Sequence, residues 1–310
     1  MRIAVYLPLI LPLLMAPFAP VMAQRLPPRA AVWLLTVAAV VLALCSAVAV
    51  GLVVLAGAAQ VPVVARLGHW SIGELRHALD PGASFIAVLG LLVIVAAVVA
   101  VGRVVLRYVK ALARNRTALR GVADDCELVV LPDDVPVAYA LPGRPAHVIV
   151  STGMLSALGP REQRALLAHE RAHLAGRHHL VTTAARIAAM VNPLLRPLHT
   201  AVAYAVERRA DEAAAREIGD RGATARAIAK AALAARNAPP APAPLLGVTT
   251  GPVPRRIMAL MSPVSGGAGR VRGLAALAAV GTLVISAAAT LEATTDLHTL
   301  IELAQAATGH

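Results

Sequence analysis

The sequence predicts a mainly α-helical integral membrane protein with four transmembrane helices and an α+β domain inserted between the third and the fourth. Three observations support this fold class. Of the 310 residues, 58% are hydrophobic, and the mean hydropathy of +0.70 is too high for an ordinary soluble domain. Only 3% of the residues are aromatic, so aliphatic helix formers supply the apolar content. Long uncharged runs flank a stretch of mixed character.

The uncharged runs define the expected membrane segments, because a helix needs about 20 apolar residues to cross a bilayer. We place these segments at residues 3–24, 30–59, 81–102 and 273–291. The first run also fits a secretory signal peptide, since Arg2 precedes it and Val21-Met22-Ala23 resembles a cleavage site. Another uncharged run, residues 237–254, is rich in proline and is expected to be a linker or loop.

The basic residues predict the orientation in the membrane. Between Arg103 and Arg120 the chain carries Lys and Arg but no acid, so the positive-inside rule makes this side cytoplasmic. We therefore expect a multi-pass protein of the cell membrane with both termini outside. The net charge of +12 then reflects topology and contact with the lipid bilayer, and no direct binding of nucleic acid is expected. The expected divisions are a membrane region (1–102), a cytoplasmic domain (103–272), a fourth transmembrane helix (273–291) and an outside tail (292–310).

The cytoplasmic domain is expected to begin with a basic helix and an acidic turn at Asp124 and Asp125. Two or three short strands are then expected, and a Pro142-Gly143 turn joins the last two segments. From Pro160 to Ala235 the pattern is helical, and apolar spacing continues past Gly176, which predicts that the helix does not break there. The expected strands are Glu127–Leu131, Val135–Ala140 and His147–Ser151.

The strongest chemical signal is His169-Glu170-Arg171-Ala172-His173, an HExxH motif on a predicted helix. Histidines four positions apart lie on one helical face and can bind a single Zn²⁺ ion, and the adjacent Glu170 is then placed to act as general base on a water. About 0.01 matches to such a pattern are expected by chance in a chain of this composition. Two imidazoles and a carboxylate suit zinc, which is the expected cofactor.

A hydrolytic zinc site needs a third protein ligand, and the sequence offers two candidates. One is Glu207, followed one turn later by Asp211, which is placed to hold a ligand histidine through its second ring nitrogen. The other is His179, because His169 to His179 also fits HExxHxxGxxH. Two further expectations concern neighbouring side chains. Tyr204 is a candidate oxyanion donor, whereas His178 and His199 are expected on a helix surface or an interface.

The order of motifs resembles the BlaR/MecR-type membrane zinc metallopeptidases, a gluzincin family, with features of the HtpX and CAAX proteases. The resemblance rests on AYALPG from Ala138, VIVSTG from Val148, the HERAH segment, Asn192-Pro193 and ERRAD from Glu207. It implies a zincin-like metallopeptidase domain with Glu207 as the third ligand. Unlike the relatives that sense β-lactams, this chain shows no evident β-lactam-binding domain after the last expected span. Ala210 also replaces the cysteine usual in the BlaR/MecR type.

The resemblance implies a membrane-embedded zinc endopeptidase that cleaves a cytoplasmic protein in regulatory proteolysis. The expected protein substrate is a transcriptional repressor or the enzyme itself. Two alternatives stay open at this point. One is a protease of membrane-protein quality control, as in the HtpX type. The other is a membrane signal receptor whose zinc domain acts without proteolysis.

Overall fold

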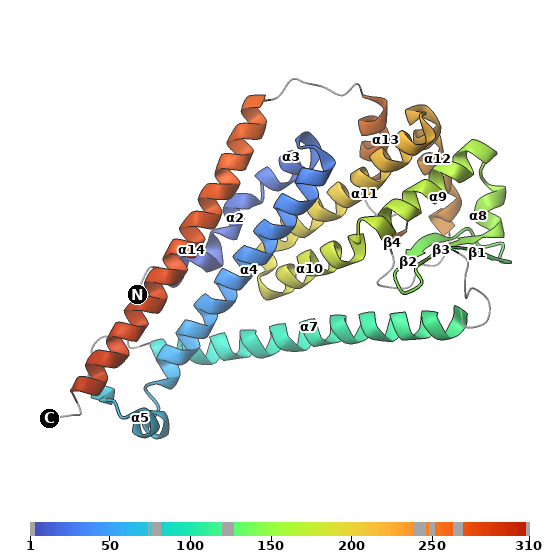
Figure 1. Cartoon of the computed structure of the whole chain (residues 1–310). Helices are drawn as coiled ribbons and strands as arrows, with labels where there is room; N and C mark the ends of the chain where they lie inside the picture. The colour runs from blue at the N-terminus through green and yellow to red at the C-terminus, as the bar shows by residue number, and fades with distance from the viewer. Residues whose placement is uncertain are drawn as a thin grey trace.

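The computed structural model of the chain describes residues 4–73, 75, 82–119, 127–237, 246–247, 252–262 and 269–307. Three helices of this part are long and apolar enough to cross a membrane. They are α4 (Pro28–Ala58), α7 (Ala83–Leu119) and α14 (Gly269–Ala306). Figure 1 shows α4 and α14 inclined in the same direction, while α7 leads away from their shared end towards a small sheet. The structure therefore agrees with a mostly helical membrane protein that carries a small sheet.

The first uncharged run forms a broken helix instead of one continuous span. Its pieces are α1 (Leu7–Ile10), α2 (Pro12–Met15) and α3 (Phe18–Arg25), and the chain bends by 47° between α2 and α3. Proline stands in the first turn of α1 and of α2, where the missing N–H group is tolerated. The described residues thus contain three helices able to span a membrane, or four if the bent pair crosses as one.

The strands form a sheet in the order β1-β3-β2-β4. The fully buried β3 (His147–Ser151) pairs in parallel with β1 (Leu128–Leu131) and antiparallel with β2 (Ala138–Leu141). The strands expected near these positions are confirmed, and the Pro142-Gly143 turn connects β2 to β3. A short β4 (Leu246–Gly247) pairs with the other edge of β2, inside a segment that the sequence predicted to be a loop.

Three ends of the remaining helices have clear local causes. The first turn of α9 contains Pro160, and the Glu162 carboxylate accepts a hydrogen bond from the Gly159 N–H at 2.9 Å. At the start of α12, the carboxylate of the N-cap residue Asp220 accepts a hydrogen bond from the Ala223 N–H, and Gly219 ends α11 with a φ of 69°. The remaining helical elements are α5 (Pro62–Gly68), α8 (Thr152–Ser156), α9 (Pro160–Ala175), α10 (His178–Val191), η1 (Pro193–Leu195), α11 (Arg196–Ile218), α12 (Arg221–Ala234), η2 (Ala235–Asn237) and α13 (Val253–Met261).

The prediction that the helix continues through Gly176 is wrong. Helix α9 ends at Ala175, and Arg177 adopts the left-handed conformation with a φ of 48° before α10 begins at His178. Apolar spacing did not reveal this break, because both helices bury an apolar face and the pattern resumes after the two connecting residues. The expected acidic turn at Asp124 and Asp125 lies outside the described residues, as does most of the proline-rich run.

Helices α10 and α11 pack against the membrane helices and share a hydrophobic cluster with α3, α4 and α14. In Figure 1 both helices lie alongside α4. Two polar contacts hold this arrangement. The side-chain amide of Asn192, between α10 and α11, donates to the Ser46 hydroxyl on α4 at 2.9 Å. Arg208 on α11 donates to three carbonyl oxygens at the end of α3, those of Ala23, Gln24 and Leu26.

Candidate metal centre

Helix α9 supplies the two histidines of the candidate centre. Because His169 and His173 are four residues apart, they lie on one face of the helix, and Glu170 follows the first of them. This face is turned inward, and all three side chains are at most 2% exposed. Two imidazoles and a carboxylate are therefore withdrawn from bulk water on a single helical turn.

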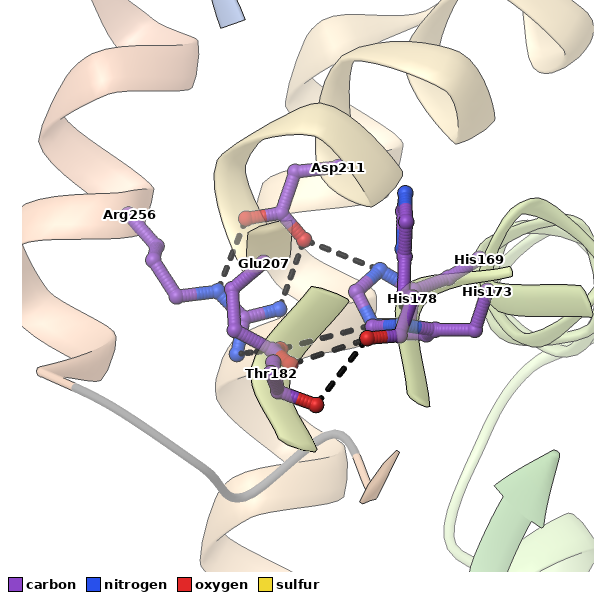
Figure 2. Close-up of polar contacts among 7 residues, drawn as sticks. All are labelled: His169, His173, His178, Thr182, Glu207, Asp211 and Arg256. Atoms are coloured by element: carbon purple, nitrogen blue, oxygen red, sulfur yellow. Dashed lines mark hydrogen bonds and ion pairs between the residues drawn. The ribbon is translucent and has the colours of Figure 1, made fainter. Parts of the chain in front are cut away.

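Helix α11 brings Glu207 to this pair. The Nε2 atoms of His169 and His173 are 3.0 Å apart, and each lies 3.6 Å from a carboxyl oxygen of Glu207. One ligand atom from each residue can be chosen so that all three lie within 4.8 Å of one another. Figure 2 shows the three side chains converging from their two helices. The structure thus brings together both histidines of the motif and one of the two candidate third ligands.

These residues fit a zinc ion. Ligand atoms about 2.0 to 2.1 Å from a tetrahedral ion are about 3.3 Å apart, which is close to the separations seen here. Two imidazole nitrogens and a carboxylate are also a donor set that zinc prefers. Burial lowers the pKa of His173, so its ring is in the neutral form that binds metals. Burial would raise the pKa of Glu207, but the charge of Arg256 outweighs it and the pKa is lowered, so Glu207 is charged.

Glu170 is fully buried, and neither of its carboxyl oxygens makes a hydrogen bond of standard geometry to the described residues. Burial raises the pKa of Glu170 to about 8, and the negative charge of Glu207 acts in the same direction. A carboxyl group with a pKa near neutrality can both accept and return a proton. A buried carboxyl group without a well-formed hydrogen bond is also costly, which points to a role in chemistry rather than in folding.

Asp211 and Arg256 surround the candidate ligands with a charged network. The Nδ1 atom of His169 lies 3.0 Å from a carboxyl oxygen of Asp211, one turn after Glu207. Arg256 on α13 donates to both oxygens of Asp211, at 2.8 and 2.6 Å, and its Nη1 lies 2.8 Å from Glu207. Burial would raise the pKa of Asp211, but hydrogen bonds from Arg256 and His169 lower it to about 2. Asp211 therefore stays charged and orients His169.

His178 lies behind His173, which corrects the expectation of a surface or interfacial residue. Its side chain is fully buried, and the two Nδ1 atoms are 3.0 Å apart. Burial lowers the pKa of His178 to about 3, with the charge of Arg209 acting in the same direction. The ring is consequently neutral and able to accept one hydrogen bond.

Two other candidates are not members of the ligand group. His179 is only half-buried, stacks on Tyr108 with ring centroids 6.4 Å apart, and is not part of the three-residue ligand group. Tyr204 belongs to the hydrophobic cluster between α11 and the membrane helices. Its proposed action on an oxyanion stays a prediction.

Two residues of the network were not anticipated from the sequence. Arg256 belongs to none of the motifs identified in the sequence, and the sequence predicts His178 only on a helix surface or an interface. Arg256 is 45 residues from Asp211, so no local spacing relates them. A usable signal existed for Arg256, since Ile257 and Leu260 beside it give α13 an apolar face on which an arginine is unusual.

Comparison with known proteins supports a peptidase. Residues 101–196 match the family model described as peptidase family M48. No curated protein and no solved structure matches the chain. The matched part contains α9 with His169 and His173 but ends before Glu207. The chain is thus similar to the M48 peptidases over this part, and the family together with the candidate ligand group indicates a metallopeptidase.

Proposed function

We propose that the protein is a membrane-embedded zinc endopeptidase. The observation that carries this proposal is the convergence of His169, His173 and Glu207 beside the buried carboxyl group of Glu170. M48 metallopeptidases generally depend on zinc, which agrees with the donor set. A structural zinc site would have no need of an uncoordinated carboxyl group at this position.

The protein residues would divide the reaction between them. A bound zinc ion supplies Lewis acidity towards a peptide carbonyl and lowers the pKa of the attacking water. Glu170 accepts the proton of that water and returns it to the leaving amine. Asp211 holds the ring of His169, and Arg256 balances the charge of the two carboxylates on α11.

The proposal is tested with Glu170→Gln in the full chain purified in detergent. The amide keeps the size of the side chain but cannot take up the proton, so we expect zinc to be retained and cleavage of an unfolded protein substrate to fall by about 10²- to 10⁴-fold. Glu217→Gln changes an exposed glutamate and serves as the control. Turnover by Glu170→Gln at the rate of the unchanged protein would exclude this role for Glu170.

The third ligand is tested by measuring the zinc content of Glu207→Ala and His179→Ala. We expect Glu207→Ala to lose zinc and His179→Ala to keep it, because only Glu207 lies within the ligand group. The reverse result would assign the ligand to His179 and would remove the basis for the BlaR/MecR resemblance.

For the substrate, we propose a cytoplasmic protein, either a transcriptional repressor or the enzyme itself, cleaved in regulatory proteolysis. This rests on the motif order and on the positive-inside rule, by which we propose that the catalytic region faces the cytoplasm and that both termini lie outside the cell membrane. Comparing the cleavage products of cells with and without the enzyme tests it. A single DNA-binding protein or a self-cleaved fragment supports regulation.

One observation favours quality control of membrane proteins as a second function. Arg208, the neighbour of the candidate ligand Glu207, binds the carbonyl groups at the end of α3 just before α4 begins. The centre is thus close to the end of a candidate span, where a membrane-anchored polypeptide can reach it. Many membrane-protein fragments in the same comparison would support this function over regulation.

A further inference from the structure

The contact between His173 and His178 gives the second candidate ligand a partner of its own. The Nε2 atom of His173 faces His169 and Glu207, and its Nδ1 atom faces the Nδ1 atom of His178 at 3.0 Å. The two rings meet edge to face, with centroids 4.9 Å apart and an angle of 87°. The two nitrogens of His173 therefore serve different neighbours.

The break between α9 and α10 delivers His178 to this place. After α9 ends at Ala175, the left-handed conformation of Arg177 turns the chain back, and His178 opens the next helix with its ring against Gly176. A Cβ atom on Gly176 would collide with the Nε2 and Cδ2 atoms of that ring. Glycine at this position is what allows the imidazole to lie behind His173.

A histidine that binds a metal through Nε2 carries its proton on Nδ1, and that N–H group needs an acceptor. Asp211 has this function for His169. We propose that His178 has it for His173, accepting the Nδ1–H hydrogen bond and holding Nε2 of His173 towards the metal. This inference rests on the zinc site of the proposed function. It assigns His178 as a positioning residue and not as a ligand.

The state of the second nitrogen of His178 supports this assignment. If Nδ1 accepts a hydrogen bond, the proton of the neutral ring is on Nε2, and Nε2 is buried without a hydrogen-bond partner among the described residues. An unsatisfied buried donor costs about 1 to 3 kcal/mol. An aliphatic side chain would avoid that cost, so the imidazole is better explained by the hydrogen bond that its Nδ1 atom accepts from His173.

The test compares His178→Asn with His178→Gln in the full chain in detergent. The Asn oxygen falls near the position of the histidine Nδ1, whereas the Gln oxygen falls near Nε2 and faces away from His173. Zinc affinity is measured by competition with a chromophoric chelator, and the geometry by the visible absorption of the cobalt-loaded protein. We expect the affinity of His178→Asn to stay within about threefold of the unchanged protein and that of His178→Gln to fall by about 10- to 100-fold. His179→Leu is the control and is expected to bind zinc normally.

The unfolding temperatures of the metal-free proteins distinguish a positioning role of His178 from a purely structural one. A positioning role predicts that His178→Asn and His178→Gln differ in zinc affinity but not in unfolding temperature. Equal zinc affinities and cobalt spectra for the two variants would overturn the inference. The proposed function fails in a distinct manner, namely if the unchanged protein takes up no zinc or if Glu207→Ala binds it at full affinity.

Discussion

Arg256 balances the charge of the carboxylates in the candidate centre. Its side chain is 0% exposed and contacts Asp211 and Glu207, which are themselves buried. Carboxylates withdrawn from water are stable only when paired, and the guanidinium group offers a planar set of donors that can serve two of them. The geometry of the third candidate ligand thus depends on a residue from α13.

Replacing Arg256 by Leu is expected to destabilise the metal-free protein by about 3 to 5 kcal/mol, because two buried carboxylates lose their cation. The measurement is thermal or chemical unfolding in detergent. Arg255→Leu is the matched control, since Arg255 is the exposed neighbour on the same helix. Equal stabilities for the two variants would show that Arg256 does not perform this function.

The sequence predicted those residues of the candidate centre that are close to one another along the chain. The pair His169 and His173 follows from helical periodicity alone, and the structure places Asp211 one turn after Glu207 beside the first histidine. Contacts between distant segments were not accessible. The partner of Asp211 comes from another helix, and the direction of the His178 side chain depends on the left-handed conformation of Arg177, which no composition signal marks.

The connection between α9 and α10 determines two features of the centre at once. It ends the helix that carries His169 and His173, and it directs α10 back so that His178 is inside and His179 is only half-buried against Tyr108. Without the break at Gly176, neither orientation would follow. The helix boundary is therefore part of the site.

Gly176→Ala is expected to lower the unfolding free energy by about 1 to 3 kcal/mol and to weaken zinc binding. The added methyl group would displace the ring of His178, whereas the φ of −79° at this position is compatible with alanine. Gly281→Ala is the control, because nothing lies within 4 Å of the added Cβ there. A variant with unchanged zinc affinity and unchanged stability would contradict this steric explanation.

Among the elements, the sequence anticipated those with a strong local pattern. The long uncharged runs correspond to α4, α7 and α14, and the β-branched segments correspond to the three predicted strands. The elements that were not anticipated include β4 and α13, since β4 has only two residues and the prolines before α13 suggested a loop. Their positions depend on partners, namely the free edge of β2 and the buried carboxylates of α11.

In the whole molecule, the hairpin of α10 and α11 extends far along α4. Ser46, which Asn192 contacts at the end of this hairpin, lies 18 residues after the start of α4, or about 27 Å along its axis. The other end of the hairpin region carries Glu207 and Asp211. One pair of helices thus connects the metal centre to the middle of the membrane helices.

Asn192→Ala is expected to destabilise the protein by about 1 to 3 kcal/mol. The Asn192 amide donates to Ser46 and to the carbonyl of Leu9, and its oxygen accepts the N–H of Leu194, so buried groups would lose their partners. Unfolding in detergent measures the effect, with the exposed Thr200→Ala as control. If both variants unfold at the same denaturant concentration, the polar contact has no stabilising function.

The shared cluster between this hairpin and α3 and α4 also restricts how the chain can change in evolution. Its members on α4 and on α11 pack in one continuous interior. A substitution by a larger side chain on one helix must therefore be compensated by a smaller side chain on another. Apolar positions on the two sides are therefore expected to vary together among homologues. The peptidase region and the membrane helices would be inherited as one unit, and neither could be exchanged for that of a distant relative without its counterpart.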